Sequence, residues 1–338
     1  MAYITLNKNN FFNNLDIIAK QTKTKDKIAL VLKDNAYGHG LKEMATLASE
    51  YGIQKAVVRT DAEAKSIEKF FEYILVLCDI PTNNCTKLRY TINDLATIHL
   101  FPKGTLVELK VDSGMHRNGI AMSELKSAFC KIKENELILE AVFTHHRSAD
   151  ELSSEWFWQK NTFKKIKKES IALAKEFGFG ALRFHSSNSA ALFRHTSFDE
   201  DMARVGIAAY GCMQFPNALK IEGLQPILSL YANKISSREL HKGECIGYGG
   251  TYEAKQNCIV SNYNFGYADG FLRNLSNRYT TPKGVELVGR ISMDNSSFLS
   301  DDEEILVFND AREIATSADT ISYEILTSLK SYIKRDII

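Results

Sequence analysis

Long hydrophobic runs, a leader segment and paired cysteines are all missing from this sequence of 338 residues. No stretch reaches the roughly 18 consecutive apolar residues that a transmembrane helix requires, and the first residues lack the basic segment and apolar core of a signal peptide. None of the six cysteines forms a C-x-x-C pair, so zinc-ribbon and thioredoxin-like sites are not expected and the cysteines are interpreted as reduced thiols. These absences predict a cytoplasmic protein with no membrane partner.

An excess of charge of one sign is missing too. The 42 Lys and Arg residues balance 41 Asp and Glu residues, which leaves a formal net charge of +1. This balance gives no electrostatic reason to expect nucleic acid or an anionic membrane as the partner. The basic run at 164–168 lies on a predicted helix and is interpreted as a solvated face rather than as a nucleic-acid patch. With 44% hydrophobic and 25% charged residues, a globular fold is expected.

A repeated unit is present instead, in which a short β-branched run is followed by a stretch with helical character. Eight such runs occur, at 28–33, 55–60, 73–79, 89–94, 106–113, 139–146, 182–188 and 203–211. The clearest helix is predicted over about 154–177, where apolar residues recur at spacings of three, four or seven. Apolar strands that alternate with helices indicate a parallel sheet covered on both sides, and eight of them suggest a closed (β/α)8 TIM-like barrel in the α/β class.

The pattern changes after Gly211, where short strands follow one another with Gly-rich turns. This change predicts a second, mostly β C-terminal domain. The expected organisation is an N-terminal strand within 1–9 that joins the β domain, a barrel over 10–223 and a β domain over 224–338. The length agrees with this division, because one domain ordinarily has about 100–200 residues.

Polar side chains stand at the predicted carboxyl ends of the barrel strands, where barrels carry their chemistry. Lys33 ends the first strand, where burial would favour a neutral amine able to form a Schiff base, although it could equally cap the strand with its ammonium in solvent. Ser189 and the backbone near Gly206 follow the seventh and eighth strands, where barrels often hold a phosphate. Together they suggest a phosphorylated aldehyde cofactor, pyridoxal phosphate.

Two other features bear on the chemistry. The pair His145 and His146 invites a metal site, but adjacent strand residues point to opposite faces and no carboxylate–histidine cluster of suitable spacing accompanies them, so no metal is expected. Tyr267, between Gly266 and Gly270, is typical of a turn or an interface. A phenol becomes a useful base only beside positive charge.

The segment 31–40, Val-Leu-Lys-Asp-Asn-Ala-Tyr-Gly-His-Gly, closely resembles the cofactor-lysine signature of alanine racemases. The resemblance continues in the same order over nearly the whole chain, through 110–117, 143–145, 185–191, 204–207, 266–270, 289–294 and 321–323. It implies an isomerase that interconverts L-alanine and D-alanine by a two-base mechanism dependent on pyridoxal 5'-phosphate and supplies D-alanine for peptidoglycan. It also implies a head-to-tail homodimer whose active sites take residues from both chains.

The resemblance further implies a role for each matching position that would touch the reacting atoms. Lys33 would carry the cofactor and serve as one base, and Tyr267 from the partner chain would serve as the second. His145 would link Tyr267 to Arg204. Arg204 would face the pyridine nitrogen and, because arginine stays protonated, would leave that nitrogen unprotonated and discourage transamination. Arg117 would contact the phenolic oxygen of the cofactor and the substrate.

The remaining positions would hold the phosphate, the substrate carboxylate or another side chain. Lys110 would be carbamylated and would orient Arg117, and Met293 would offer a backbone N–H to the substrate carboxylate. The phosphate would be held by Tyr37, Ser189, Gly206, Ile207 and Tyr323.

Several positions depart from the pattern of the family. Asp34 stands where many relatives have alanine, Arg147 where small residues are common, and Val205 where proline is common, and Glu324 begins a stretch that is often basic. These departures bear on the pocket entrance and the dimer contacts more than on the reaction.

Three other functions are alternatives to this one. The first is a broad-specificity amino-acid racemase. Kinetics on a panel of L-amino acids would distinguish it from an alanine racemase. A decarboxylase of basic amino acids has a similar architecture but carries a Gly-Pro segment in its β domain, and this chain has no Gly-Pro dipeptide. A pyridoxal-phosphate carrier would need only the barrel, so the β domain with Tyr267 argues against it.

Overall fold

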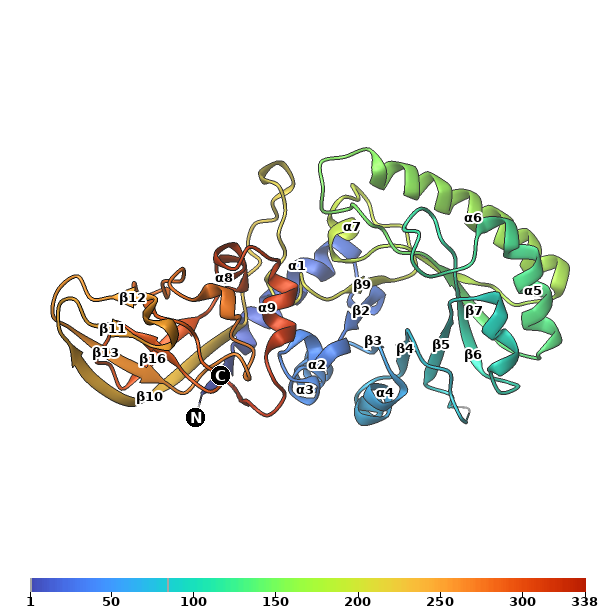
Figure 1. The fold of residues 1–338 in the computed structure, drawn as a ribbon. Helices are drawn as coiled ribbons and strands as arrows, with labels where there is room; N and C mark the ends of the chain where they lie inside the picture. The colour runs from blue at the N-terminus through green and yellow to red at the C-terminus, as the bar shows by residue number, and fades with distance from the viewer. Residues whose placement is uncertain (1, 84) are drawn as a thin grey trace.

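The computed structural model describes residues 2–83 and 85–338 and shows a barrel lobe and a β lobe (Figure 1). The barrel lobe contains eight parallel strands in the spatial order β8-β7-β6-β5-β4-β3-β2-β9, so the last of them pairs with the first, β2. The strands are β2 (Ile28–Val31), β3 (Lys55–Val58), β4 (Tyr73–Val76), β5 (Leu88–Ile92), β6 (Leu106–Lys110), β7 (Ile138–Phe143), β8 (Arg183–His185) and β9 (Ala203–Val205). All eight predicted barrel strands are confirmed, and the barrel fold with them.

The barrel is nearly closed: its two end strands, β8 and β9, are connected by individual hydrogen bonds. Between β8 and β9, Asp201 N donates to Phe184 O at 3.2 Å and Arg204 N donates to Ser187 O at 2.9 Å. The side chain of Asp201 also accepts from Phe184 N at 2.7 Å. This join fixes Arg204, on β9, beside the carboxyl end of β8.

Helices cover the outside of the barrel. They are α1 (Lys8–Thr22), α3 (Leu41–Tyr51), α4 (Asp61–Ile67), α5 (Leu125–Glu134) and α6 (Glu155–Phe177). Two segments of five residues each, α2 (Lys33–Tyr37) and α7 (Ser189–Phe193), follow the carboxyl ends of β2 and β8. The longest, α6, confirms the helix predicted over 154–177. It buries Trp156, Phe163 and Ile166 and exposes Lys164 and Lys165, as a solvated basic face requires. None of the described helices is long and apolar enough to cross a membrane.

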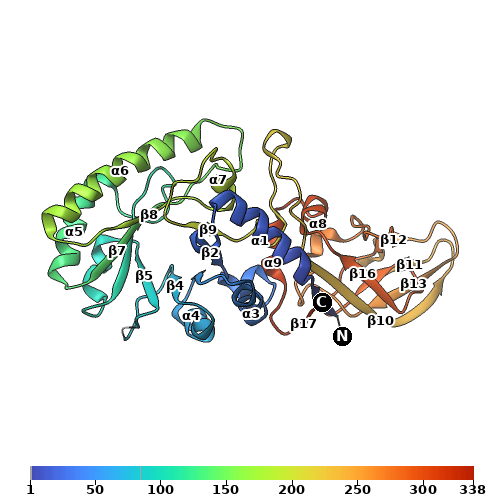
Figure 2. The same cartoon turned by 180° about the vertical axis from the view of Figure 1, so that it is seen from behind.

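The β lobe is built around a seven-stranded sheet that includes strands from both ends of the chain. Its strands are β1 (Tyr3–Leu6), β10 (Leu228–Leu240), β13 (Cys258–Tyr263), β14 (Leu287–Val288), β15 (Ser296–Phe298), β16 (Glu304–Phe308) and β17 (Lys334–Ile337). The strand β1 pairs antiparallel with β10 and parallel with β17. Figure 2 shows both termini at this sheet, with α1 leading from it to the barrel. A separate hairpin joins β11 (Cys245–Ile246) to β12 (Tyr252–Glu253).

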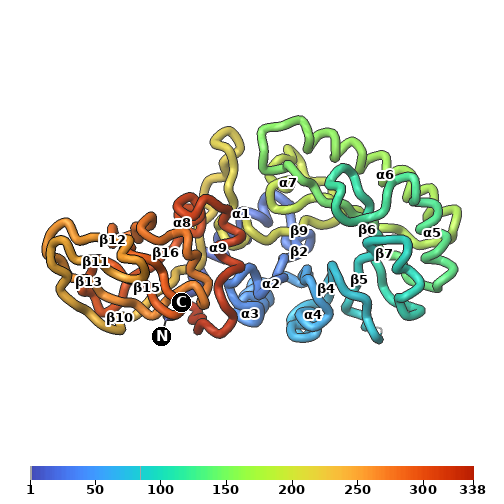
Figure 3. The backbone as a smooth tube through the Cα atoms, viewed as in Figure 1, coloured from blue at the N-terminus to red at the C-terminus, as the bar shows by residue number. Residues whose placement is uncertain are grey.

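Two short helices of the β lobe were not predicted from the sequence. They are α8 (Ala311–Ser317) and α9 (Ser322–Ser328), and each spans only about two turns, too short for a clear apolar period. The helix α9 packs against the turn that follows β2, so closely that a Cβ at Gly38 would lie 1.9 Å from Leu326 O. Arg335 donates to Gly38 O from the other side at 2.8 and 3.0 Å. The tube in Figure 3 follows this junction, where the end of the chain meets its first barrel turn.

Candidate active site

The turn after β2 has an unusual backbone. Lys33 is followed by a run of non-glycine residues with positive φ, at 54° for Asp34, 56° for Asn35 and 52° for both Ala36 and Tyr37. Left-handed helical conformation costs an L-residue about 1–2 kcal/mol, so such a run persists only where its surroundings determine it. Here Asp34 N donates to Glu63 Oε1 at 2.7 Å, and Asn35 Oδ1 accepts from Leu41 N at 2.9 Å. Strain of this kind clusters at functional sites.

A cup of hydroxyl and amide groups faces this turn. Ser189 opens α7, and its Oγ accepts from Gly206 N at 3.0 Å and from Ala208 N at 3.4 Å. A Cβ at Gly206 would lie 2.8 Å from the Tyr37 hydroxyl, so only glycine permits this approach. The Tyr37 and Tyr323 rings lie 5.8 Å apart. The structure thus brings Tyr37, Ser189, Gly206 and Tyr323 together from α2, α7, the end of β9 and α9.

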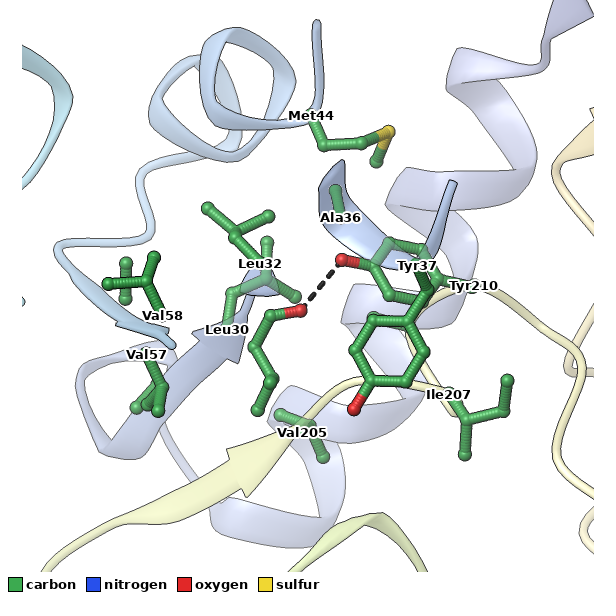
Figure 4. Close-up of a cluster of buried hydrophobic side chains, with 14 of the residues drawn as sticks. Leu30, Leu32, Ala36, Tyr37, Met44, Val57, Val58, Val205, Ile207 and Tyr210 are labelled. Atoms are coloured by element: carbon green, nitrogen blue, oxygen red, sulfur yellow. Dashed lines mark hydrogen bonds between the residues drawn. The ribbon is translucent and has the colours of Figure 1, made fainter. Parts of the chain in front are cut away.

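Apolar packing holds the cup in place. Figure 4 shows Tyr37 beside Tyr210, Val205 and Ile207, to the right of the end of β2. The Tyr210 hydroxyl donates to Val31 O at 2.7 Å, which fastens the loop after β9 to the end of β2, two residues before Lys33. Burial raises the pKa of Tyr37, so its phenol stays protonated and can donate a hydrogen bond to an anion.

Cationic and imidazole groups gather at the ends of β6, β7 and β9. Lys110, the last residue of β6, is 9% exposed. Burial, reinforced by Arg204 and Arg117, lowers the pKa of Lys110 to about 8. Burial and Arg204 also hold the pKa of His145 well below its usual value, so its imidazole is neutral. Lys33 belongs to the same neighbourhood, since its charge contributes to the lowered pKa of Lys110.

Arg204 is buried at the centre of this group. Its Nη2 donates to Thr144 O at 2.7 Å, and its Nη1 lies 2.5 Å from His185 Nδ1. Burial lowers the pKa of Arg204 to about 10, which still leaves it charged at neutral pH. Its guanidinium lies over the Phe143 ring, 5.1 Å from the centroid.

Tyr267 and Met293 lie together in the β lobe, on the loops that follow β13 and β14. Tyr267 N donates to Ser292 O at 3.0 Å, and Ala268 N donates to Met293 O at 2.9 Å. A Cβ at Gly266 would lie 2.3 Å from Met293 O, so the two loops touch. Tyr267 is 41% exposed and Met293 is 54% exposed, as residues that contact another molecule would be.

Three of the residues that depart from the family pattern form ion pairs or are buried. Asp34 pairs with Arg59 at 2.9 Å and lies 4.0 Å from the Lys33 ammonium, so it adds negative charge next to the lysine. Arg147 pairs with Glu155 at the surface. Val205 is fully buried in the packing under the cup.

The two adjacent histidines face different surroundings. His146 Nε2 lies 3.1 Å from Ser186 Oγ. The pKa of His145 is lowered by burial and by the positive charges of Arg204 and Lys110. Within 2–83 and 85–338, no group of three or more His, Cys, Asp or Glu residues is arranged to hold a metal ion.

Sequence reasoning gave no role to His185 or Glu108, which lie directly behind Arg204. The sequence does mark Glu108, because a carboxylate within the apolar run 106–110 indicates a buried charge that needs a partner. The signal for His185 was its place within a segment that matches the family.

Fold and site together define the class of protein: an enzyme built on a (β/α)8 barrel with an attached β domain, whose polar groups gather at the carboxyl ends of the strands. Comparison with known proteins identifies the family. The model of the alanine racemase N-terminal domain matches residues 6–214, and that of the C-terminal domain matches residues 227–337. The chain belongs to the alanine racemase family and is therefore an isomerase.

Individual relatives agree over their full length. The alanine racemase of a Nitratiruptor species is 45% identical over 99% of both chains, and that of Campylobacter curvus is 42% identical over 100% of both. Among solved structures, the alanine racemase of Clostridium difficile 630 superposes with a TM-score of 0.88 at 28% identity, covering 100% of this chain and 95% of that one. The Bacillus anthracis alanine racemase with bound L-Ala-P gives 0.87 at 29%, with the same coverage. The family resemblance and the racemase activity expected from the sequence are confirmed.

Proposed function

We propose that the chain interconverts L-alanine and D-alanine with pyridoxal 5'-phosphate bound covalently to Lys33, using two bases. This proposal rests on one observation: the turn that follows Lys33 packs against the cup of hydroxyl and amide groups formed by Ser189 and Gly206. The cup fits a phosphate, because Gly206 brings its backbone to the Tyr37 hydroxyl where any side chain would fill the space. The phosphate would be held by Tyr37, Ser189, Gly206, Ile207 and Tyr323.

Charged groups of the barrel would orient the cofactor and the substrate. Arg204 would contact the ring nitrogen, and its persistent positive charge would keep a proton off that nitrogen. Arg117 would contact the phenolic oxygen and the substrate, while the backbone N–H of Met293 would bind the substrate carboxylate. When bound, pyridoxal phosphate would spread the negative charge that the α-carbon gains when its proton leaves.

Lys33 and Tyr267 would hold and move the α-proton. Inversion requires removal of the proton on one face and its return on the other, which two bases on opposite faces perform directly. The neutral ring of His145 can both donate and accept a hydrogen bond, so it can link the partner subunit's Tyr267 to Arg204.

The cofactor and the reaction are tested together. Purified protein should show a visible absorbance band that borohydride abolishes, and peptide mapping should find the reduced adduct on Lys33. The same preparation should convert L-alanine to the racemic mixture in a chiral assay. An adduct on a different lysine would overturn the assignment of Lys33 without affecting the family.

Lys110 is expected to be carbamylated, or to have an anion bound in the place of the carbamate. With its pKa lowered to about 8, a fraction of its amine is neutral, attacks CO2 and releases a proton, which converts a cation beside Arg117 into an anion that accepts from the guanidinium. Protein equilibrated with carbon-13 bicarbonate should show a carbamate resonance, and Lys110→Gln should lose it. We expect Lys110→Gln to raise KM for alanine by about 10-fold or more, as loss of an orienting partner does. A resonance that persists in Lys110→Gln would place the carbamate elsewhere.

Activity is expected to require a homodimer, which we propose because Tyr267 and Met293 are exposed in the β domain, placed at 224–338, rather than at the barrel site. Dilution should reduce activity in parallel with dissociation measured by ultracentrifugation. A fully active monomer would contradict the shared site.

Mixed dimers give a sharper test. Lys33→Ala and Tyr267→Phe subunits, each nearly inactive alone, should form hybrids in which one site has both native bases. Random reassociation makes half of the dimers hybrid, with one intact site of two, so about a quarter of wild-type activity should return. Each parent taken through the same reassociation is the control. Verified hybrids that remain inactive would show that both bases come from one chain.

A further inference from the structure

A buried carboxylate lies behind the proposed cofactor site. Glu108, on β6, is fully buried and accepts from the Tyr73 hydroxyl at 2.6 Å and from Arg183 Nη2 at 2.9 Å, both at Oε1. Its Oε2 lies 2.9 Å from His185 Nε2. Burial alone would raise the pKa of Glu108, but His185 and Arg183 lower it to about 2. The carboxylate is therefore charged at any working pH, and a buried charge of this kind is retained only where its partners are fixed.

The position of every proton between Glu108 and Arg204 follows from hydrogen-bond chemistry. A guanidinium can only donate, so at the 2.5 Å contact with Arg204 Nη1 the acceptor is His185 Nδ1. A neutral imidazole with Nδ1 as acceptor carries its hydrogen on Nε2, which then donates to Glu108. Burial lowers the pKa of His185, in agreement with a neutral ring. Protonation of Nδ1 would set two donors against each other.

Packing prevents the ring from relaxing into the other arrangement. The His185 ring is completely buried and stacks on Phe143, with centroids 4.8 Å apart and planes inclined by 12°. Phe143 also lies under the Arg204 guanidinium. A flip of His185 would break its contacts with Glu108 and Arg204 together, inside a region with no space for compensation.

We propose that Glu108 is a positioning residue for the racemisation reaction. Acting through His185, it fixes the imidazole tautomer that accepts from Arg204 and so holds the guanidinium against the ring nitrogen of the cofactor. This inference rests on the proposed pyridoxal phosphate site. With Nη1 held by His185 and Nη2 by Thr144 O, the plane of the Arg204 guanidinium is set from the protein side.

The chain offers a matched control for Glu108. Glu140, on β7, accepts from Arg183 at 2.8 Å and from Arg89 at 2.9 Å, so it belongs to the same group of charges. Glu140 is thus held by two arginines, whereas the carboxylate next to His185 Nε2 is that of Glu108. Replacing either carboxylate with an amide removes one negative charge near Arg183, but only Glu108→Gln replaces the group next to His185 Nε2, which can only accept, with one that can also donate.

The experiment compares the wild type, Glu108→Gln and Glu140→Gln as full-length holoenzymes labelled with nitrogen-15 histidine. The wild type and Glu140→Gln should give a His185 signal with a protonated Nε2 and an unprotonated Nδ1. In Glu108→Gln, whose amide can donate as well as accept, the two tautomers should exchange. The rate constant kcat should fall by about 10–100-fold, as it does when the partner behind an active-site ligand is lost. The ratio of side transamination to racemisation should rise, because a mobile Arg204 allows the ring nitrogen to take a proton.

A second pair of variants applies if Glu108→Gln does not fold. The Asn side chain in His185→Asn places its oxygen near the former Nδ1 position and can still accept from Arg204, whereas His185→Gln reaches the former Nε2 position and cannot. His185→Asn should therefore retain more activity and a lower transamination ratio than His185→Gln.

Three results would overturn the proposal: a wild-type His185 protonated on Nδ1, an unchanged transamination ratio in folded Glu108→Gln, or His185→Gln performing as well as His185→Asn. Failure of the cofactor assignment would be recognised separately. It would appear as borohydride labelling away from Lys33, and it would leave the tautomer measurement on His185 unaffected.

Discussion

Lys33→Ala is expected to lose the visible absorbance of bound cofactor and more than about 10⁴-fold of the racemase activity, because one substitution removes both the covalent attachment and a base. The position supports this expectation. Lys33 follows the end of β2, opens the strained turn and belongs to the neighbourhood of Lys110 and Arg204. Absorbance before and after borohydride, with the chiral assay on L-alanine and on D-alanine, measures both losses.

A demanding control for this prediction lies on the neighbouring strand. Lys55 begins β3, at the opposite end of the barrel, and burial lowers the pKa of its amine. If a lowered amine pKa were sufficient, Lys55 would form the adduct. We expect Lys55→Ala to keep the absorbance, the borohydride adduct and the activity. An adduct lost in Lys55→Ala but retained in Lys33→Ala would reverse the assignment.

The barrel could be predicted from the sequence because its strands are short, continuous apolar runs separated by helices, and burial on both faces leaves that signature. The run Ile28–Val31 is buried at all four positions, and its neighbours along the sheet are nearly as apolar. The helices α8 and α9 could not be predicted in this way, because about two turns give too few positions for a period. Their places are determined by contacts such as that of Leu326 with Gly38.

Part of the candidate site could be predicted from the sequence, namely the residues whose type and place at the end of a strand already indicate a chemical role. Lys33, Ser189 and Gly206 met this condition as candidates, and the family resemblance implied the other roles. The link from Glu108 through His185 to Arg204 could not be predicted from the sequence, because it depends on which side chains of β6, β8 and β9 point inward at the same level. Side-chain direction inside a barrel follows from strand stagger, which no local pattern encodes.

Tyr267→Phe is expected to separate the two proton transfers. The substitution removes the phenol and keeps the ring, and at 41% exposure within its own chain Tyr267 contributes little to that chain's folding. Cofactor binding should survive, because Lys33 and the phosphate cup lie in the barrel. Racemisation should fall about 10²–10⁴-fold in both directions, since inversion needs both bases whichever isomer enters. The chiral assay measures this loss.

The fate of the α-proton distinguishes loss of one base from general damage. By the assignment that follows the family, Lys33 serves the D-isomer and Tyr267 serves the L-isomer, so Tyr267→Phe in deuterated solvent should exchange the α-proton of D-alanine much faster than that of L-alanine. Tyr332 is a matched control, because it is an exposed phenol of the same domain whose hydroxyl donates to Asp269 Oδ1 at 2.8 Å. Tyr332→Phe should exchange both isomers at wild-type rates. General damage to the β domain would slow both isomers of alanine together, whereas equal and rapid exchange of both in Tyr267→Phe would mean that a single base reaches both faces. Unequal exchange with the D-isomer ahead supports Lys33 as the base for the D-isomer and Tyr267 as the base for the L-isomer, whereas unequal exchange with the L-isomer ahead would reverse that assignment.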